Sequence, residues 1–231
     1  MIQLYLLHCE ALKSETERMA EKLTLQRRKR TGQYYKCSDK VRSLAGEALT
    51  LYALSLNVGA LYMLPVFIFN EFGKPSLQNY PDFHYNVSHS GDLVICATSS
   101  LPVGVDVQEI LDKHLSMTLL SRCFDKEEAT NILTVSPEQR LKLFFHYWVA
   151  KESYIKCLGK GMSWNMCTFS TCTNPVIQDG VLTEYEIRHF PMPEKYVCAV
   201  CTSGDLFPSA PQKVSSGELL SFIDGLSQSH E

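Results

Sequence analysis

The segment from Trp148 to Lys156, WVAKESYIK, places two lysines and a glutamate inside an otherwise aromatic and aliphatic run. If the segment is helical, Glu152 and Lys156 lie one turn apart on the same face. Such a pair is most often a surface salt bridge that contributes about 0.2–0.5 kcal/mol. At about 100° per residue, however, Glu152 falls on the border of an apolar seam, where a carboxylate can line a cleft. Lys151 falls nearly on the seam itself, which an ordinary surface helix does not explain.

A second polar group lies in the short apolar segment GVDVQ. On a strand, Asp106 and Gln108 project to one face, whereas Glu109 points to the other. A carboxylate in so apolar a strand is either solvated at a sheet edge or bound to a positive group, and the sequence leaves both possibilities open. Together with Glu152, these side chains offer only oxygen ligands, which suit Mg²⁺ better than a thiolate-binding metal.

Several basic residues precede these segments. A solvated loop is the simpler interpretation of the run RRKR, although arginine also suits phosphate oxygens, and Lys74 lies in a glycine-proline loop where a backbone can approach a ligand. The candidate phosphate contacts are the run from Arg27 to Arg30, Arg42 and Lys74, the last between Gly73 and Pro75.

The segment NVSHS places Ser88 and His89 side by side at the end of an expected strand. A serine hydrolase is one hypothesis, but adjacent side chains diverge on an extended chain, and the sequence has no G-x-S-x-G elbow. A structural histidine is the simple interpretation of His89. Recognition of a phosphate or a ribose is the better functional alternative.

Composition narrows the classes of protein. The 231 residues are 45% hydrophobic and 20% charged, as is typical of a globular protein, and the net charge of −3 argues against a general nucleic-acid binder. We expect no secretory signal, because the N-terminus lacks a basic n-region and a small-residue cleavage site. We expect no membrane span, because no apolar run approaches about 18 residues. The nine cysteines show no disulfide framework and predict reduced thiols in the cytoplasm. The pair Cys198 and Cys201 has CxxC spacing, but opposite faces of a strand are poor geometry for zinc.

The hydrophobic pattern predicts an α+β fold, with helices and then strands, followed by helices and then strands. A capping box at Ser14 predicts one helix start, a long helix follows from about Ser38, and another runs from Ser136 to a stop at Gly159. Strands are expected between residues 84 and 109, with turns at 90–92 and 99–102. We expect the polar C-terminal end to be frayed.

Four segments, GKP, NVSHS, GVDVQ and WVAKESYIK, stand in an order and spacing that resembles the 4′-phosphopantetheinyl transferase superfamily. The chain is most similar to the larger type that primes peptide synthetases and polyketide synthases. The resemblance implies two similar α+β subdomains, at residues 1–103 and 104–231, that form an intramolecular pseudodimer with the active cleft between them. The first half would bind coenzyme A, and the second would carry the metal and catalytic residues.

The resemblance also implies a reaction and its residues. The family transfers the phosphopantetheine arm of coenzyme A to a serine of an apo acyl or peptidyl carrier protein and releases 3′,5′-ADP. Asp106 and Glu152 would hold Mg²⁺, with Mn²⁺ as a possible substitute, and Lys156 would contact the phosphates and assist the leaving group. Glu152 is also a plausible general base. The implied coenzyme A contacts are Arg27, Arg30, Arg42, Gly73, Lys74, Pro75, Ser88, His89 and Lys156.

One position departs from the family pattern, because Gln108 stands where an acidic residue is common. Its amide oxygen can still coordinate a cation, with one negative charge fewer, or a water can take its place. The expected protein is a monomer, with a carrier protein and coenzyme A as partners and without a nucleic-acid or membrane partner. Two other hypotheses remain: a non-catalytic binding module for coenzyme A or a carrier protein, and a phosphate-binding hydrolase.

Overall fold

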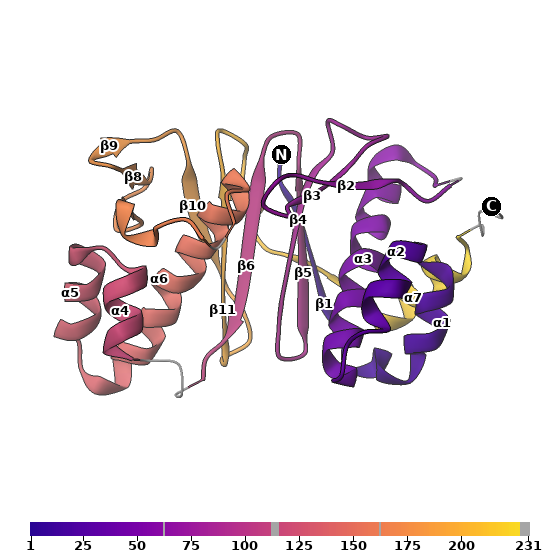
Figure 1. Ribbon diagram of the computed structural model, residues 1–231, viewed down its shortest axis with the longest axis horizontal. Helices are drawn as coiled ribbons and strands as arrows, with labels where there is room; N and C mark the ends of the chain where they lie inside the picture. Colours follow the sequence, from indigo (N-terminus) through magenta and orange to yellow (C-terminus); the bar gives the residue numbers. More distant parts are fainter. Residues whose placement is uncertain (62, 112–115, 162, 227–231) are drawn as a thin grey trace.

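The computed structural model describes residues 1–61, 63–111, 116–161 and 163–226. Two β-sheets stand side by side in the middle of the molecule, and helices cover the outer side of each (Figure 1). The strand order is β12-β1-β5-β4 in the first sheet and β10-β11-β6 in the second. The α+β expectation is therefore confirmed.

The first sheet is antiparallel except for the parallel pairing of β12 with β1. Its strands are β1 (Gln3–His8), β4 (His84–Ser90), β5 (Leu93–Ser99) and β12 (Gln212–Val214). The second sheet is antiparallel throughout, with strands β6 (Val103–Glu109), β10 (Glu186–Phe190) and β11 (Tyr196–Thr202). Two small sheets lie outside these: β2 (Phe67–Phe69) with β3 (Pro75–Leu77), and β7 (Phe169–Ser170) with β8 (Ile177–Gln178) and β9 (Val181–Leu182).

Helices of the two halves lie on opposite outer faces (Figure 1). Beside the first sheet are η1 (Glu10–Glu15), α1 (Thr16–Lys22), α2 (Leu25–Thr31), α3 (Cys37–Val58) and α7 (Ser216–Asp224). Beside the second are α4 (Met117–Cys123), α5 (Lys126–Thr134), α6 (Pro137–Leu158) and the short η3 (Met166–Thr168). No helix in the described part of the chain is long and apolar enough to cross a bilayer.

The apolar core continues through both sheets because β5 is buried on its two faces. Leu93 and Ile95 pack toward the second sheet, whereas Val94 and Cys96 pack toward α3. This period of two is what a strand requires when both of its faces are covered. Burial of the shared face holds the two halves together.

Helix boundaries follow the sequence signals at α6 but not at α1. The helix α6 begins after Ser136, and it ends at Gly159, which takes the left-handed conformation with φ of 68°. The predicted capping box at Ser14 is wrong. This serine lies in the 3-10 turn η1, and α1 starts one residue after Glu15 without a side-chain cap.

The expectation of a frayed C-terminal end is wrong for residues 212–224. The strand β12 pairs with β1, and α7 buries Leu219 and Ile223 in the same core as α3. The hydroxyl of Tyr52 on α3 donates a hydrogen bond to Glu218 of α7. The end of the chain thus completes the first half of the molecule. The division at residues 103 and 104 stays a prediction, and residues 227–231 lie outside the described ones.

Side chains join the edge strands β4 and β6, which belong to different sheets. Alternate polar side chains of β4 accept hydrogen bonds from alternate backbone N–H groups of β6, so that they take the place of a carbonyl ladder. The three bonds join Asn86 to Val105 (2.9 Å), Ser88 to Val107 (3.2 Å) and Ser90 to Glu109 (2.9 Å).

Gly104 allows α6 to lie directly on β6. A Cβ atom at this position would stand 2.0 Å from the carbonyl oxygen of Ser153 and 2.3 Å from the backbone nitrogen of Cys157. Both contacts are with backbone atoms, which cannot rotate away. The absence of a side chain at Gly104 therefore brings Glu152 and Lys156 within reach of Asp106.

We expect Gly104→Ala to lower the free energy of unfolding by about 1–3 kcal/mol or more, because the helix must move away from the strand. Urea denaturation measures this change. Gly217→Ala is the matched control, since a Cβ there meets no atom within 4 Å, and its stability should be unchanged or slightly higher. Equal stability of the two variants would contradict the close-packing argument.

Candidate active site

Three elements bring one polar side chain each to a common point. Asp106 on β6 is 4% exposed, and its Oδ1 accepts hydrogen bonds from Ser88 Oγ at 2.7 Å and Lys156 Nζ at 2.5 Å. Lys156 also donates to Ser88 Oγ at 3.2 Å. Of the two possibilities for Asp106, the structure therefore shows the second: the carboxylate is buried and bound to a positive group.

The other carboxylate oxygen, Asp106 Oδ2, is buried and has no hydrogen-bond partner among the described residues. A buried polar atom left in this state is unfavourable by about 1–3 kcal/mol. Asp106 lines a cavity of about 290 Å³, together with Gln108, Trp148 and Glu152. The free oxygen therefore indicates a place for an electropositive ligand.

Glu152 is 5% exposed and faces the same cavity from α6. Burial raises the pKa of Glu152 to about 7; Lys156 opposes this rise, and the charge of Asp106 adds to it. The carboxyl group is thus poised to gain or lose a proton near neutral pH. A bound cation would favour its ionised form.

The side chains around this cavity fit a magnesium ion. Two carboxylates, from Asp106 and Glu152, and the amide oxygen of Gln108 are hard oxygen donors, and no thiol is among the described residues that line the cavity. The opposite strand face carries Glu109, whose carboxylate accepts a bond from Lys195 at 3.0 Å. Gln108 therefore faces the cavity and Glu109 does not, as the alternation of the strand predicts.

A second cavity, of about 250 Å³, adjoins the first at His89, which borders both. Its lining contains three arginines, Arg27, Arg30 and Arg42, together with Gly73 and Pro75. So many cationic side chains around one cavity suit a ligand with several phosphate groups.

Two of the three arginines are held in place by neighbours. Arg27 donates to Glu47 at 2.8 Å and to Ser43 at 3.0 Å. Arg42 donates to the carbonyl of Gly91 at 2.9 Å and pairs with Asp39. These bonds orient the guanidinium groups before a ligand arrives, which reduces the entropy lost on binding.

The chain matches known proteins along most of its length. Residues 102–201 match the 4′-phosphopantetheinyl transferase superfamily, and residues 9–101 match the family described as 4′-phosphopantetheinyl transferase, N-terminal. The 4′-phosphopantetheinyl transferase Sfp of Bacillus subtilis (strain 168) is 34% identical over 89% of this chain and 93% of its own. The chain belongs to the 4′-phosphopantetheinyl transferase superfamily.

Other relatives of this transferase include the 4′-phosphopantetheinyl transferase psf-1 of Bacillus pumilus, which is 30% identical over 87% of this chain and 88% of its own. Among solved structures, the holo-[acyl-carrier-protein] synthase of Thermotoga maritima aligns with 44% of this chain and 61% of its own, at 16% identity and a TM-score of 0.34. The two family matches meet between the two sheets of the pseudodimer.

Lys74 is the one predicted phosphate contact that the transferase does not bring to either cavity. Its Nζ donates to the carbonyl oxygens of Cys157 at 2.8 Å and Val103 at 3.3 Å, and burial lowers the pKa of Lys74. Gly73 and Pro75, on either side, do line the arginine-rich cavity. The Lys74 side chain ties the β2–β3 hairpin to the end of α6.

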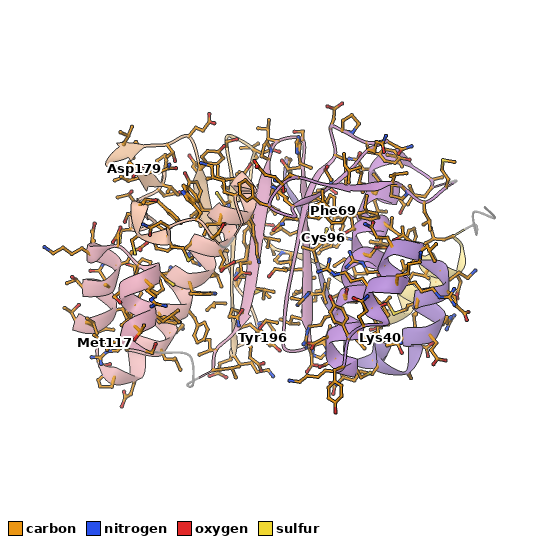
Figure 2. The ribbon with its side chains drawn as sticks, in the orientation of Figure 1. Lys40, Phe69, Cys96, Met117, Asp179 and Tyr196 are labelled. Atoms are coloured by element: carbon orange, nitrogen blue, oxygen red, sulfur yellow. The ribbon has the colours of Figure 1, made fainter. Side chains whose placement is uncertain are left out.

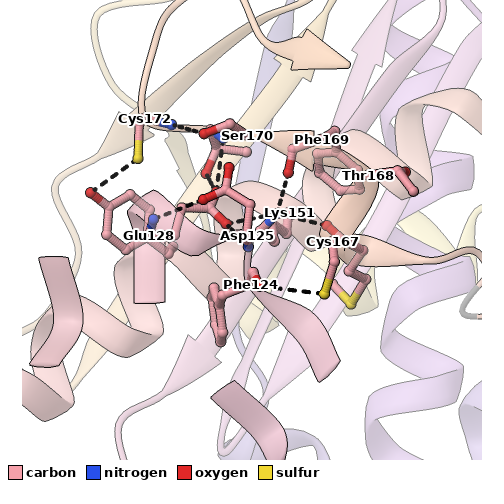
Figure 3. A network of polar contacts seen from close by, with 12 residues as sticks. Phe124, Asp125, Glu128, Lys151, Cys167, Thr168, Phe169, Ser170 and Cys172 are labelled. Atoms are coloured by element: carbon pink, nitrogen blue, oxygen red, sulfur yellow. Dashed lines mark hydrogen bonds and ion pairs between the residues drawn. The ribbon is translucent and has the colours of Figure 1, made fainter. Parts of the chain in front are cut away.

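Lys151 points away from the candidate active site, into the core on the other side of α6. It forms an ion pair with Glu128 at 2.7 Å, in which both side chains are fully buried. Its Nζ also donates to the carbonyl oxygens of Met166 at 2.8 Å and Phe169 at 2.6 Å, while Glu128 accepts two bonds from Thr171 (Figure 3). This network explains a lysine on the apolar seam and fixes the rotation of α6.

Sequence reasoning missed several residues that line the two cavities. Trp148 on α6 borders the cavity with Asp106. Phe69, at the end of β2 (Figure 2), borders the arginine-rich cavity. Tyr85 borders it as well, and the alternation of β4 could have revealed this, because Tyr85 shares a strand face with His89.

The CxxC pair of the transferase behaves as the strand geometry predicts. Cys198 belongs to the core between the sheets, whereas Cys201 packs with the helices on the outer face. All nine cysteines are free. Because the thiols of Cys198 and Cys201 lie on opposite faces of β11, they cannot bind one metal ion together.

The raised pKa of Glu152 predicts a pH-dependent stability. An unfolded carboxyl group loses its proton near 4.5 and this one at about 7, so the free energy of unfolding falls as the pH rises between these values. With a chelator present to remove metal ions, the free energy of unfolding of Glu152→Gln should exceed that of the native protein by up to about 3 kcal/mol at pH 8. Near pH 4.5 the two values should be equal. Urea denaturation at both pH values measures this. An equal difference at the two values would show that the carboxyl group has an ordinary pKa.

Proposed function

We propose that this protein transfers the 4′-phosphopantetheine arm of coenzyme A to a serine of an apo acyl or peptidyl carrier protein and releases 3′,5′-ADP. The observation that carries the proposal is Asp106 Oδ2, which has no partner among the described residues, on a side chain that lines one cavity with Glu152 and Lys156. Membership of the superfamily and the adjoining arginine-rich cavity support it.

The two adjoining cavities suit the two parts of coenzyme A that lie on either side of its pyrophosphate. Arg27, Arg30 and Arg42 are placed to contact the phosphorylated nucleotide of coenzyme A, and Gly73 and Pro75 offer backbone atoms to its base. His89 borders both cavities, so a pyrophosphate that spans them would pass beside it and beside Ser88. The pantetheine arm would then extend from the cavity that holds Glu152.

Mg²⁺, or Mn²⁺ in its place, is the proposed cofactor, held by Asp106, Glu152 and Gln108. When bound, it would neutralise the negative charge that builds up on the pyrophosphate. Lys156 now occupies one oxygen of Asp106, which leaves Oδ2 for the cation. The ammonium group of Lys156 has three N–H donors, of which Asp106 and Ser88 accept two. The third can donate to a phosphate oxygen while the bond to Asp106 remains.

The chemistry assigned to the side chains is a direct displacement at phosphorus. Glu152 accepts the proton of the carrier serine hydroxyl, and the serine oxygen forms a bond to the phosphorus that bears pantetheine. The bond between this phosphorus and the bridging oxygen breaks, and the electron pair leaves with 3′,5′-ADP. Lys156 stabilises or protonates the departing oxygen. The pKa of about 7 keeps Glu152 able to take up the proton.

We also propose that the protein acts as a monomer in the cytoplasm. Both halves of the site come from one chain, because β4 belongs to the first sheet and β6 to the second. The nine free cysteines are consistent with a reducing compartment.

Intact-protein mass spectrometry of an apo carrier protein, incubated with coenzyme A and Mg²⁺, tests the reaction. We expect a mass increase equal to one phosphopantetheine, and a loss of at least about 100-fold in kcat for Glu152→Gln, because proton transfer contributes about 10²–10⁴. Glu127→Gln is the control, since Glu127 is exposed on α5. Tight binding of coenzyme A without any transfer to several carriers would favour a non-catalytic binding module.

Replacement of Gln108 tests the metal site. We expect Gln108→Glu to tighten Mg²⁺ binding about tenfold, because a third carboxylate adds a negative charge beside the cation. Isothermal titration with Mg²⁺ in the presence of coenzyme A measures the affinity. Glu109→Gln, on the opposite strand face, should leave it unchanged. Weaker binding by Gln108→Glu would place the cation elsewhere.

A further inference from the structure

The hydroxyl group of Tyr85 is buried without a hydrogen-bond partner among the described residues. Tyr85 lies on β4 and is 4% exposed; its ring packs edge-on against Phe67 and stacks on Phe83. A hydroxyl group left in this state destabilises the folded protein by about 1–3 kcal/mol. Buried polar groups are nearly always paired, so this one suggests a partner that the free chain does not supply.

The hydroxyl group belongs to the arginine-rich cavity. The ring of Tyr85 borders this cavity and also a neighbouring one of about 440 Å³. Burial and the nearby Cys96 thiol act on the hydroxyl, and so do Arg27 and Glu47, which line the arginine-rich cavity and not its neighbour. The polar end of Tyr85 therefore lies on the side where the nucleotide of coenzyme A is proposed to bind.

The polar groups beside Tyr85 already form hydrogen bonds with other groups of the protein. The carboxylate of Glu47 accepts bonds from the backbone and hydroxyl of Thr24, at 2.9 and 2.8 Å, and from Arg27. The hydroxyl of Thr50 donates to the carbonyl of Gly46 at 2.9 Å. This part of the wall is thus a closed network, and the Tyr85 hydroxyl remains outside it.

We propose that the Tyr85 hydroxyl recognises the adenine ring of coenzyme A through a hydrogen bond to the polar edge of the base. The proposal rests on the function proposed above. The aromatic side chains of Tyr34, Phe67 and Phe69 in the same cavity suit a flat ring, while the arginines suit its phosphate groups. The hydroxyl can donate or accept, so it can pair with either kind of atom on the base.

Burial raises the pKa of the Tyr85 hydroxyl well above its ordinary value. The group therefore stays neutral over the pH range in which the enzyme would work, and it does not repel the phosphate groups of the ligand. Binding of the base would satisfy a hydroxyl that the free protein leaves unpaired. The free energy so recovered would favour a nucleotide over a ligand that lacks the base.

Tyr85→Phe removes only this hydroxyl and should change stability and binding in opposite directions. The melting temperature of the free protein should rise by about 2–4 °C, because an unpaired buried polar group is lost. The dissociation constant for 3′,5′-ADP should increase about tenfold. Binding of the same ribose bisphosphate without the base should stay within about twofold. Differential scanning fluorimetry and isothermal titration measure the two effects.

Tyr52→Phe is the matched control. Tyr52 lies in the same core, but its hydroxyl already donates to Glu218 and lies outside the cavity. Its loss should lower the melting temperature and leave the dissociation constant for 3′,5′-ADP within about twofold. The two tyrosine variants thus separate a general effect of losing a hydroxyl from an effect on the nucleotide.

Three results would overturn the assignment of Tyr85. They are a lower melting temperature for Tyr85→Phe, unchanged binding of 3′,5′-ADP, and equal weakening for the ligand with and without the base. The carrier-modification assay distinguishes this failure from failure of the proposed function. If Tyr85→Phe binds 3′,5′-ADP normally and still transfers phosphopantetheine, only the proposed contact between Tyr85 and adenine is wrong. A wild-type protein that neither binds 3′,5′-ADP nor modifies a carrier would overturn both.

Discussion

The contact of α6 with β6 at Gly104 is the constraint on which the candidate active site depends. Backbone atoms of Ser153 and Cys157 occupy the space where a side chain would stand. Because the helix lies so close, Glu152 and Lys156 reach the strand that carries Asp106 and Gln108. The side-chain bonds from β4 to β6 then hold the first half of the molecule against the same strand. One strand thus aligns both halves of the site.

The three charges of the segment WVAKESYIK are balanced in different ways. Lys151 forms an ion pair with Glu128 inside the core, and its ammonium group also donates to the backbone carbonyl oxygens of Met166 and Phe169 (Figure 3). Lys156 pairs with Asp106 at the cavity. Glu152 has no equivalent partner within the part of the chain that the structure describes, and its pKa is raised to about 7 as a result of burial. The same helix therefore carries a charge that stabilises its position and a charge that stays available for chemistry.

Much of the fold could be predicted from local patterns. The start and stop of α6 follow from Ser136 and Gly159, because caps depend on backbone groups close in sequence. The opposite faces of Gln108 and Glu109 follow from the period of a strand. The capping box at Ser14 failed because a 3-10 turn occupies those residues, and nothing local distinguishes that turn from the first turn of an α-helix.

The site could be predicted only as far as its motifs reach. Asp106, Glu152 and Lys156 share a cavity as expected, but the position of the Lys74 ammonium depends on carbonyl groups far along the chain. The sequence could not predict that the Tyr85 hydroxyl has no hydrogen-bond partner among the described residues, since this depends on which neighbouring groups are already hydrogen-bonded elsewhere. Such features belong to tertiary packing, for which one sequence carries no direct signal.

The position of β12 and α7 has a consequence for how the chain folds. The first sheet and the core under α3 receive their last strand and helix from residues 212–224, after the whole second half has been made. During synthesis, β1 therefore has an open edge until the end of the chain emerges. The two halves are therefore interlocked in the chain, because the last strand and helix of the first half follow the whole of the second half. Contacts of such large sequence separation slow the last step of folding.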